Sequence, residues 1–264
     1  MKLPYFEIAA FSRRSFAGNP AGVCLLEDWL PDGLLQSIAT ENNLAETAFV
    51  VPRGERYELR WFSPAVEIDL CGHATLASAH VLFRHMGAKS ETLRFYSPRS
   101  GELGVARDGE RLVLDFPARS ATPCDVTPQL AEALGRMPLS LYEARDYMAV
   151  FESEADIRAL KPNFALLMAL PNHGVVVTAP GTDSDFVSRF FAPSVGLDED
   201  SVTGSTHCYL IPFWAERLAK KTLFARQLSK RGGELFCELR GDRVRIGGDA
   251  VTYLTGEIEV PNES

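Results

Sequence analysis

The sequence predicts an α+β fold of two similar domains, each a barrel-like, mostly antiparallel sheet around one apolar central helix. The first observation is an internal repeat, because the segment 60–85 (RWFSPAVEIDLCGHATLASAHVLFRH) returns in altered form at 189–218 (RFFAPSVGLDEDSVTGSTHCYLIPFWAERL). A second motif repeats with the same offset, since 97–103 (SPRSGEL) returns at 229–235 (SKRGGEL). Two motifs that share one offset indicate duplicated domains, because this repeat is far longer than a solenoid unit.

The composition is that of an ordinary globular protein, with 46% hydrophobic and 23% charged residues in 264. The net charge is −8 and the basic residues are scattered, which argues against nucleic acid as a partner. No run approaches the roughly 18 apolar residues that span a bilayer, and no signal peptide pattern opens the chain. The five cysteines are odd in number and form no CxxC pair. We therefore expect a reduced, cytoplasmic protein without a disulfide framework, a metal site or a membrane partner.

The first half reads as short strands rich in aromatic and β-branched residues, at 3–11, 21–26, 45–51, 57–62 and 64–70. Gly18–Asn19–Pro20 is expected to form a tight turn, because Gly and Asn tolerate a positive φ and Pro fixes its own. Leucine and isoleucine recur at helical spacing over 31–41, and Asn42–Asn43 closes that helix.

A central helix is predicted over 74–83, where nearly every residue is apolar or small. Such a helix is buried on every side. Gly87 ends it in the favoured C-terminal position. Strands then follow to Phe116, so we place the domains at 1–117 and 118–264, with the last strand, about 252–264, as a candidate to pack on the first.

The second half is predicted to hold a mixture of short helices and strands. We expect an amphipathic segment near 129–134, strands at 141–145 and 147–151, a helix from 154, a strand at 174–179, the repeated motif at 189–218, and strands over 223–260. His173 falls in a turn, Pro-Asn-His-Gly. The repeat supports a curved sheet around a central helix in this half as well.

The two helix starts are candidate anion sites. At Gly72 and at Gly204–Ser205 a glycine allows close backbone approach, and the free N–H groups of a first turn bind carboxylate or phosphate. The hydroxyls of Thr75 and Ser205 are further donors. The alternative is two ordinary capped helix starts.

Three titratable residues are candidates for acid–base chemistry. His73 follows the first repeated glycine, and histidine titrates near neutrality. Glu46 begins an apolar strand, where Phe49 and Val50 could remove it from water. Asp200 precedes the second helix start. The alternatives are a structural histidine, an exposed strand-edge acid and a helix-capping acid.

Four motifs resemble the PhzF-like family of phenazine-biosynthesis isomerases. They are GNPAGV (18–23), NNLAETAFV (42–50), RWFSPAVEIDLCGHATLASAHVL (60–82) and EDSVTGSTHCYLIPFW (199–214). The resemblance implies a diaminopimelate-epimerase-like fold, in which two pseudo-twofold-related domains enclose the active site. It also implies catalysis without a cofactor, usually by a homodimer, on a small carboxylate-bearing molecule.

The resemblance also implies roles for individual residues. Glu46 matches the catalytic acid/base, and His73 and Asp200 match proton-handling positions. Substrate-binding roles fall on the remaining motif residues, namely Asn19, Gly72, Gly204 and Ser205. One departure from the two-thiol epimerases is that Cys71 precedes the first glycine, whereas Thr203 precedes the second. Cys71 is then expected to be a packed vestige.

The leading hypothesis is therefore a cofactor-independent isomerase that shifts a proton on a small carboxylate. One rival is an amino-acid epimerase or racemase, and another is a non-catalytic protein that binds small molecules. Arg60 and Arg189 could pair with Glu67 and Asp198 or contact the substrate, and the sequence leaves both possibilities open.

Overall fold

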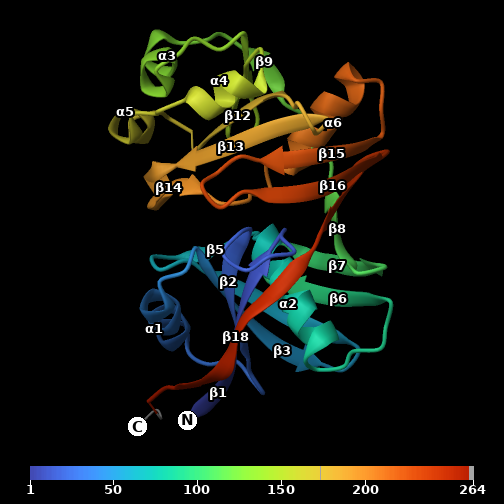
Figure 1. The fold of residues 1–264 in the computed structure, drawn as a ribbon. Helices are drawn as coiled ribbons and strands as arrows, with labels where there is room; N and C mark the ends of the chain where they lie inside the picture. Colours follow the sequence, from blue (N-terminus) through green and yellow to red (C-terminus); the bar gives the residue numbers. More distant parts are fainter. Residues whose placement is uncertain (173, 262–264) are drawn as a thin grey trace. The chain divides into compact units, whose positions relative to one another are not determined.

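The computed structural model describes residues 1–172 and 174–261. The chain folds as two compact units (Figure 1). Unit 1 comprises residues 1–115 and 247–264, and unit 2 comprises residues 116–246. His173, which we expected in a turn, lies outside the described residues, as does the end of the strand expected to reach 264.

Unit 1 is built on a mixed sheet that is mostly antiparallel. Along the sheet the strands run in the order β18–β1–β2–β3–β4–β6–β7–β8, with β5 also paired to β4. The pairs β2–β3 and β4–β6 are parallel. Their bounds are β1 Lys2–Ala10, β2 Asn19–Leu25, β3 Glu46–Arg53, β4 Arg56–Phe62, β5 Glu67–Ile68, β6 Thr92–Ser97, β7 Gly101–Asp108, β8 Arg111–Pro117 and β18 Ala250–Glu259.

Helix α2 (Gly72–Arg84) is the centre of unit 1. It contacts β18 and β1 near one edge of the sheet, β2 and β3 in the middle, and β7 near the other edge. The sheet must therefore curve around the helix. Within α2 only His80 and Arg84 are not buried, which confirms the predicted burial. On the other face of the sheet, α1 (Asp32–Asn42) packs Leu35 and Ile38 in one cluster with Phe49 of β3.

Unit 2 repeats the pairing of unit 1. The pairs β11–β12 and β13–β15 are parallel, as β2–β3 and β4–β6 are in unit 1. The pairs β12–β13 and β15–β16 are antiparallel, as β3–β4 and β6–β7 are. The strands are β9 Thr122–Cys124, β10 Ser140–Glu143, β11 Tyr147–Val150, β12 Val175–Pro180, β13 Phe186–Ala192, β14 Leu197–Asp200, β15 Thr222–Gln227, β16 Gly233–Arg240 and β17 Arg243–Gly248. The predicted fold class is confirmed.

The helices of unit 2 are α3 Pro128–Leu134, α4 Glu154–Ala159, α5 Phe164–Met168 and α6 His207–Arg217, with a 3₁₀ turn at Pro193–Val195. The first three contribute to one apolar cluster with β11, β12 and β13. Helix α6 contacts β15 and β16 and contains Pro212. A proline removes the N–H that would bond the carbonyl four residues earlier. Here the freed Cys208 carbonyl accepts instead from the Arg119 N–H, 2.9 Å away.

Two local predictions are wrong, and one helix was not predicted. Asn19 and Pro20 belong to β2 rather than to a turn, and the reversal lies before them, where Gly18 has φ 67°. The strand expected at 64–70 shrinks to Glu67–Ile68. The Ser63 hydroxyl accepts hydrogen bonds from the N–H groups of Ala65 and Val66 and so holds a turn before it. Helix α5 has no counterpart among the predicted elements.

The second repeated helix also begins later than predicted. Gly204 and Ser205 lie in a turn, and α6 starts at His207. Bonds between residues three apart hold this turn, with the N–H of His207 on the Gly204 carbonyl (3.1 Å) and that of Cys208 on the Ser205 carbonyl (3.2 Å). No helix among the described residues is long and apolar enough to cross a membrane.

Candidate active site

Strand order brings the candidate residues of unit 1 together. Strands β2 and β3 are parallel neighbours, so they start at the same end of the sheet. Asn19 is the first residue of β2 and Glu46 the first of β3. Helix α2 packs against both strands, and its first turn carries His73 directly after the N-cap residue Cys71 and Gly72.

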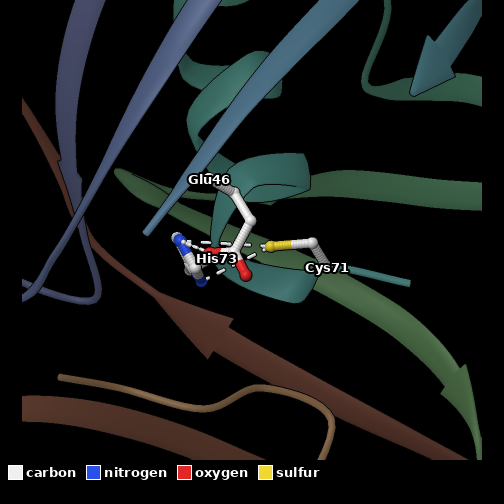
Figure 2. A group of neighbouring side chains, drawn as sticks. All are labelled: Glu46, Cys71 and His73. Atoms are coloured by element: carbon white, nitrogen blue, oxygen red, sulfur yellow. Dashed lines mark hydrogen bonds and ion pairs between the residues drawn. The ribbon is translucent and has the colours of Figure 1, made fainter. Parts of the chain in front are cut away.

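Figure 2 shows Glu46, Cys71 and His73 with their side chains pointing toward one another. The Nε2 atom of His73 lies 3.0 Å from Oε2 of Glu46. On its other side, Nδ1 of the same ring lies 3.1 Å from Nδ2 of Asn19 and 3.5 Å from Sγ of Cys71. The His73 side chain is 5% exposed and that of Glu46 16%, so this contact is largely removed from water.

Burial and neighbouring charge act in opposite directions on His73. Burial alone would lower its pKa, but the Cys71 and Glu46 side chains outweigh burial and hold the pKa of His73 well above its ordinary value. Burial also raises the pKa of the Cys71 thiol to about 11, with the Glu46 carboxylate adding to the effect. At neutral pH Cys71 is then an uncharged thiol, so the charge that favours a protonated His73 is that of Glu46.

Glu46 is shielded by a different set of neighbours from the one we predicted. Side chains alternate along a strand. Phe49 faces the α1 side of the sheet, in one cluster with Leu35 and Ile38. Glu46 lies on the opposite face, toward α2, where it meets His73 and Cys71. Val50 shares that face of β3, whereas Phe49 does not.

The start of α2 retains part of the predicted anion site. Its N-cap residue, Cys71, makes no side-chain cap of the kind that a serine or aspartate would make. The Thr75 hydroxyl, in contrast, donates to the Cys71 carbonyl at 2.6 Å and is fully buried. The role of Thr75 as a donor to a ligand is therefore not supported.

In unit 2, Asp200 belongs to a buried hydrogen-bond network. The Thr203 hydroxyl donates to Oδ2 of Asp200 at 2.5 Å. Gln227, at the end of β15 and 1% exposed, accepts from the Thr203 N–H at 2.8 Å. Its amide nitrogen donates to the Asp200 carbonyl and to the Thr203 hydroxyl, both at 3.0 Å. The network fixes the segment that leads into Gly204 and Ser205.

Gly204 is buried and Ser205 half-buried. Because both precede α6, the predicted anion site there is a turn rather than the first turn of a helix. Asp200, Gly204 and Ser205 are thus close together in sequence and structure within unit 2. Asn19, Glu46, Gly72 and His73 form the corresponding group in unit 1.

The two repeated arginines are engaged in ion pairs. The Arg60 side chain, 13% exposed, lies 2.6 Å from Glu67 and 2.9 Å from Asp32. Arg189 pairs with Glu199, at 2.7 and 3.0 Å, rather than with Asp198 as we considered. It also donates to the carbonyls of Ile157 and Leu160. Both arginines therefore have structural partners.

Two residues of the candidate site were not predicted as such from the sequence. Cys71 was expected to be a packed vestige, yet its sulfur faces His73 and Glu46. Its position beside His73 in sequence was the available signal. Gln227 ends an ordinary strand, and no local pattern distinguishes it. Its role depends on pairing between β13, β14 and β15, which only the folded chain reveals.

Comparisons with known proteins agree with this architecture. A family model described as phenazine biosynthesis-like protein, PhzC–PhzF, matches residues 8–256. An uncharacterized isomerase of Pseudomonas aeruginosa is 54% identical over 261 residues, covering 98% of this chain and 100% of that protein. The crystal structure of a PhzF-family phenazine biosynthesis protein from Enterococcus faecalis aligns with a TM-score of 0.96 and 47% identity, covering 98% of this chain and 100% of that one.

The fold extends to more distant epimerases. A hydroxyproline epimerase from Agrobacterium vitis aligns with a TM-score of 0.63 at 10% identity, over 97% of this chain and 92% of that one. At this identity the match concerns the fold alone, and it agrees with the predicted epimerase-like architecture. The chain therefore belongs to the phenazine biosynthesis-like family, PhzC–PhzF, and is an isomerase of that family.

Proposed function

We propose that this isomerase moves a proton between two carbons of a small carboxylate-bearing metabolite, without a cofactor, with Glu46 as the acid/base. The observation that carries the proposal is the buried contact between Glu46 and His73. A carboxylate largely removed from water and held by an imidazole is a common arrangement for proton transfer in enzymes. Glu46 is the first residue of β3, and His73 lies in the first turn of α2.

In the proposed reaction the Glu46 carboxylate accepts a proton from a substrate carbon and becomes a neutral acid. The electron pair of the broken C–H bond shifts along the conjugated substrate. Glu46 then returns the proton to a second carbon, so that the product is an isomer and the enzyme is regenerated. His73 holds the carboxylate through Nε2, and Asn19 fixes the ring at Nδ1. A direct contact of Asn19 with substrate stays a prediction.

Anion binding is assigned to backbone and hydroxyl donors rather than to arginine. Arg60 and Arg189 are occupied by acidic partners. The uncapped start of α2 at Gly72 and the turn at Gly204–Ser205 offer N–H groups instead. A proton-handling role for Asp200, which the family resemblance implies, stays a prediction. The proposal takes a homodimer as the working form.

The two-thiol epimerase alternative has little support from the site. Thr203 stands where a second thiol would be needed, and its hydroxyl is bonded to Asp200. The Cys71 thiol, with its pKa raised to about 11, is a poor base at neutral pH. Named isomerases among the relatives also weigh against the non-catalytic alternative.

The experiment is proton NMR in D2O with the purified protein and a panel of substrates. The panel contains a dihydro-hydroxyanthranilate together with small amino and hydroxy acids. The proposal expects deuterium to enter one compound at a carbon that changes hybridisation, in wild type and in Cys71→Ser. Exchange at an amino-acid α-carbon with inversion, abolished in Cys71→Ser, would establish the epimerase instead.

A further inference from the structure

The Glu46–Cys71–His73 group combines three kinds of donor atom. A carboxylate oxygen, a sulfur and an imidazole nitrogen, one from each residue, lie within 4.8 Å of one another. The measured separations are 3.0 Å from His73 Nε2 to Glu46 Oε2 and 3.9 Å from His73 Nε2 to Cys71 Sγ. Around tetrahedral zinc, donors at about 2.0 to 2.3 Å from the metal lie about 3.3 to 3.7 Å apart. The His73–Glu46 and His73–Cys71 separations are each within a few tenths of an ångström of that spacing.

We propose that Glu46, Cys71 and His73 form a binding site for one thiophilic divalent cation of the Zn²⁺ type. Three protein ligands leave the fourth tetrahedral position open, as in catalytic rather than structural zinc sites. A thiolate and a carboxylate together balance the two positive charges of the ion, so the buried site becomes neutral on binding. The donor set also favours zinc-like ions over Mg²⁺ or Ca²⁺, which prefer oxygen ligands.

The surroundings of the site fit this assignment. Asn19 contacts Nδ1 of His73 and leaves Nε2 facing Glu46, while Sγ of Cys71 lies 3.5 Å from Nδ1 and 3.9 Å from Nε2. An outer hydrogen bond of this kind orients a metal-binding imidazole, and rotation of the amide lets it accept from a protonated Nδ1. The ligand atoms come from the start of β3 and from the N-cap residue and first turn of α2. The side chain of Glu46 is the most exposed of the three.

Proton balance follows from the ligand states. The Cys71 thiol must lose its proton to bind as a thiolate, and His73 must give up the proton at Nε2 that faces Glu46. Both protons pass to solvent. No second group of this composition is present among residues 1–172 and 174–261. The cysteines outside this group are Cys24, Cys124, Cys208 and Cys237.

Occupation of the site would also stop catalysis. The ion would hold the Glu46 carboxylate that we assign to proton transfer, so Zn²⁺ would inhibit exchange in competition with substrate. This consequence rests on the proposed function. Metal binding itself does not, and a titration without any substrate tests it even if Glu46 proves not to be the acid/base.

The probe is Co²⁺, which takes zinc-like sites and absorbs in the near ultraviolet when a thiolate binds it. The reduced wild-type protein is titrated with Co²⁺ and then with Zn²⁺, with folding of each variant checked by circular dichroism. We expect one equivalent of thiolate–cobalt absorption, displaced by Zn²⁺. The band should disappear in Cys71→Ser, remain in Cys124→Ser, and weaken at least about tenfold in affinity in Glu46→Gln.

Two results would overturn the proposal. One is a wild-type protein that develops no thiolate–cobalt band at stoichiometric metal. The other is a band that survives Cys71→Ser or disappears in Cys124→Ser, since either would place the metal elsewhere. Inhibition of exchange by Zn²⁺ is read separately, and its absence alongside a normal Co²⁺ titration would count against the proposed role of Glu46 rather than against the site.

Discussion

At the scale of single residues, the site depends on an imidazole held between unlike neighbours. His73 meets a carboxylate at one nitrogen and an amide at the other, and both contacts are buried. The identity of His73 and Glu46 as candidates follows from the sequence, because each stands at an unusual place in an apolar element. Their mutual contact does not follow, since it depends on the parallel pairing of β2 with β3 and on the packing of α2 against both.

The first prediction concerns the pH dependence of stability. The pKa of His73 is raised in the folded protein. Its contribution is therefore fully present below the unfolded value of about 6.5 and is lost as pH rises through the folded pKa. In urea unfolding, the stability advantage of wild type over His73→Gln should fall as pH rises from about 6.5 toward the folded pKa, by up to about 1.4 kcal/mol per pH unit.

His80 provides the matched contrast for this measurement. Burial and the neighbouring His85 and Arg84 lower the pKa of His80 to about 4. Its contribution is present above about 6.5 and is lost as pH falls toward 4, the opposite direction. His80→Gln should therefore reduce the acid sensitivity of stability and leave the alkaline side unchanged. A His73→Gln difference that is flat from pH 6 to 9 would contradict the assigned pKa shift.

At the scale of elements, the two repeated helix starts differ although their sequences correspond. Helix α2 begins at its glycine, whereas α6 begins three residues after Gly204, behind a turn braced by Thr203 and Gln227. The sequence predicts two equivalent starts. The difference arises because Thr203, in place of a cysteine, bonds to Asp200, and a distant glutamine holds both. Such side-chain networks have no periodic signature in the sequence.

The second prediction tests Gln227 as a positioning residue. Gln227→Met leaves the buried Thr203 N–H and Asp200 carbonyl without their partner, at a cost of about 1 to 3 kcal/mol in unfolding free energy. With Asp200 less well held, kcat should fall more than KM rises. Gln129→Met, at an exposed position of α3, is the control and should change stability by less than about 0.5 kcal/mol. If Gln227→Met and Gln129→Met changed stability and kcat equally, Gln227 would not be a positioning residue.

The third prediction concerns close packing at the end of β17. A Cβ at Gly248 would lie 2.3 Å from the ring of Phe11. Phe11 is fully buried and has φ 61°, so the ring has little freedom to move. Gly248→Ala should destabilise the protein by about 1 to 3 kcal/mol in urea unfolding.

The control for this variant is another glycine. Gly33, in the first turn of α1, faces open space. Gly33→Ala should stabilise the protein by about 0.5 to 1 kcal/mol, because alanine loses less backbone entropy in a helix. A neutral Gly248→Ala would show that Phe11 yields more easily than its burial indicates.

At the scale of the whole molecule, duplication is what the sequence predicted best. The shared offset of two motifs predicts two similar domains, and the strand pairing of unit 2 repeats that of unit 1. Positions of elements follow from hydrophobic periodicity and turn residues. Helix α5 was not predicted, and the strand predicted at 64–70 is only Glu67–Ile68, because short elements depend on tertiary contacts more than on local pattern.

The central claim is that Glu46 transfers the proton, and it is tested most directly by exchange. Deuterium incorporation from D2O into the substrate is measured by NMR for wild type and Glu46→Gln at equal concentration and pH. The amide keeps the shape of the side chain and removes its basicity. We expect incorporation in Glu46→Gln to be slower by about 10²- to 10⁴-fold. Incorporation at the wild-type rate would show that another residue moves the proton and would contradict the mechanism.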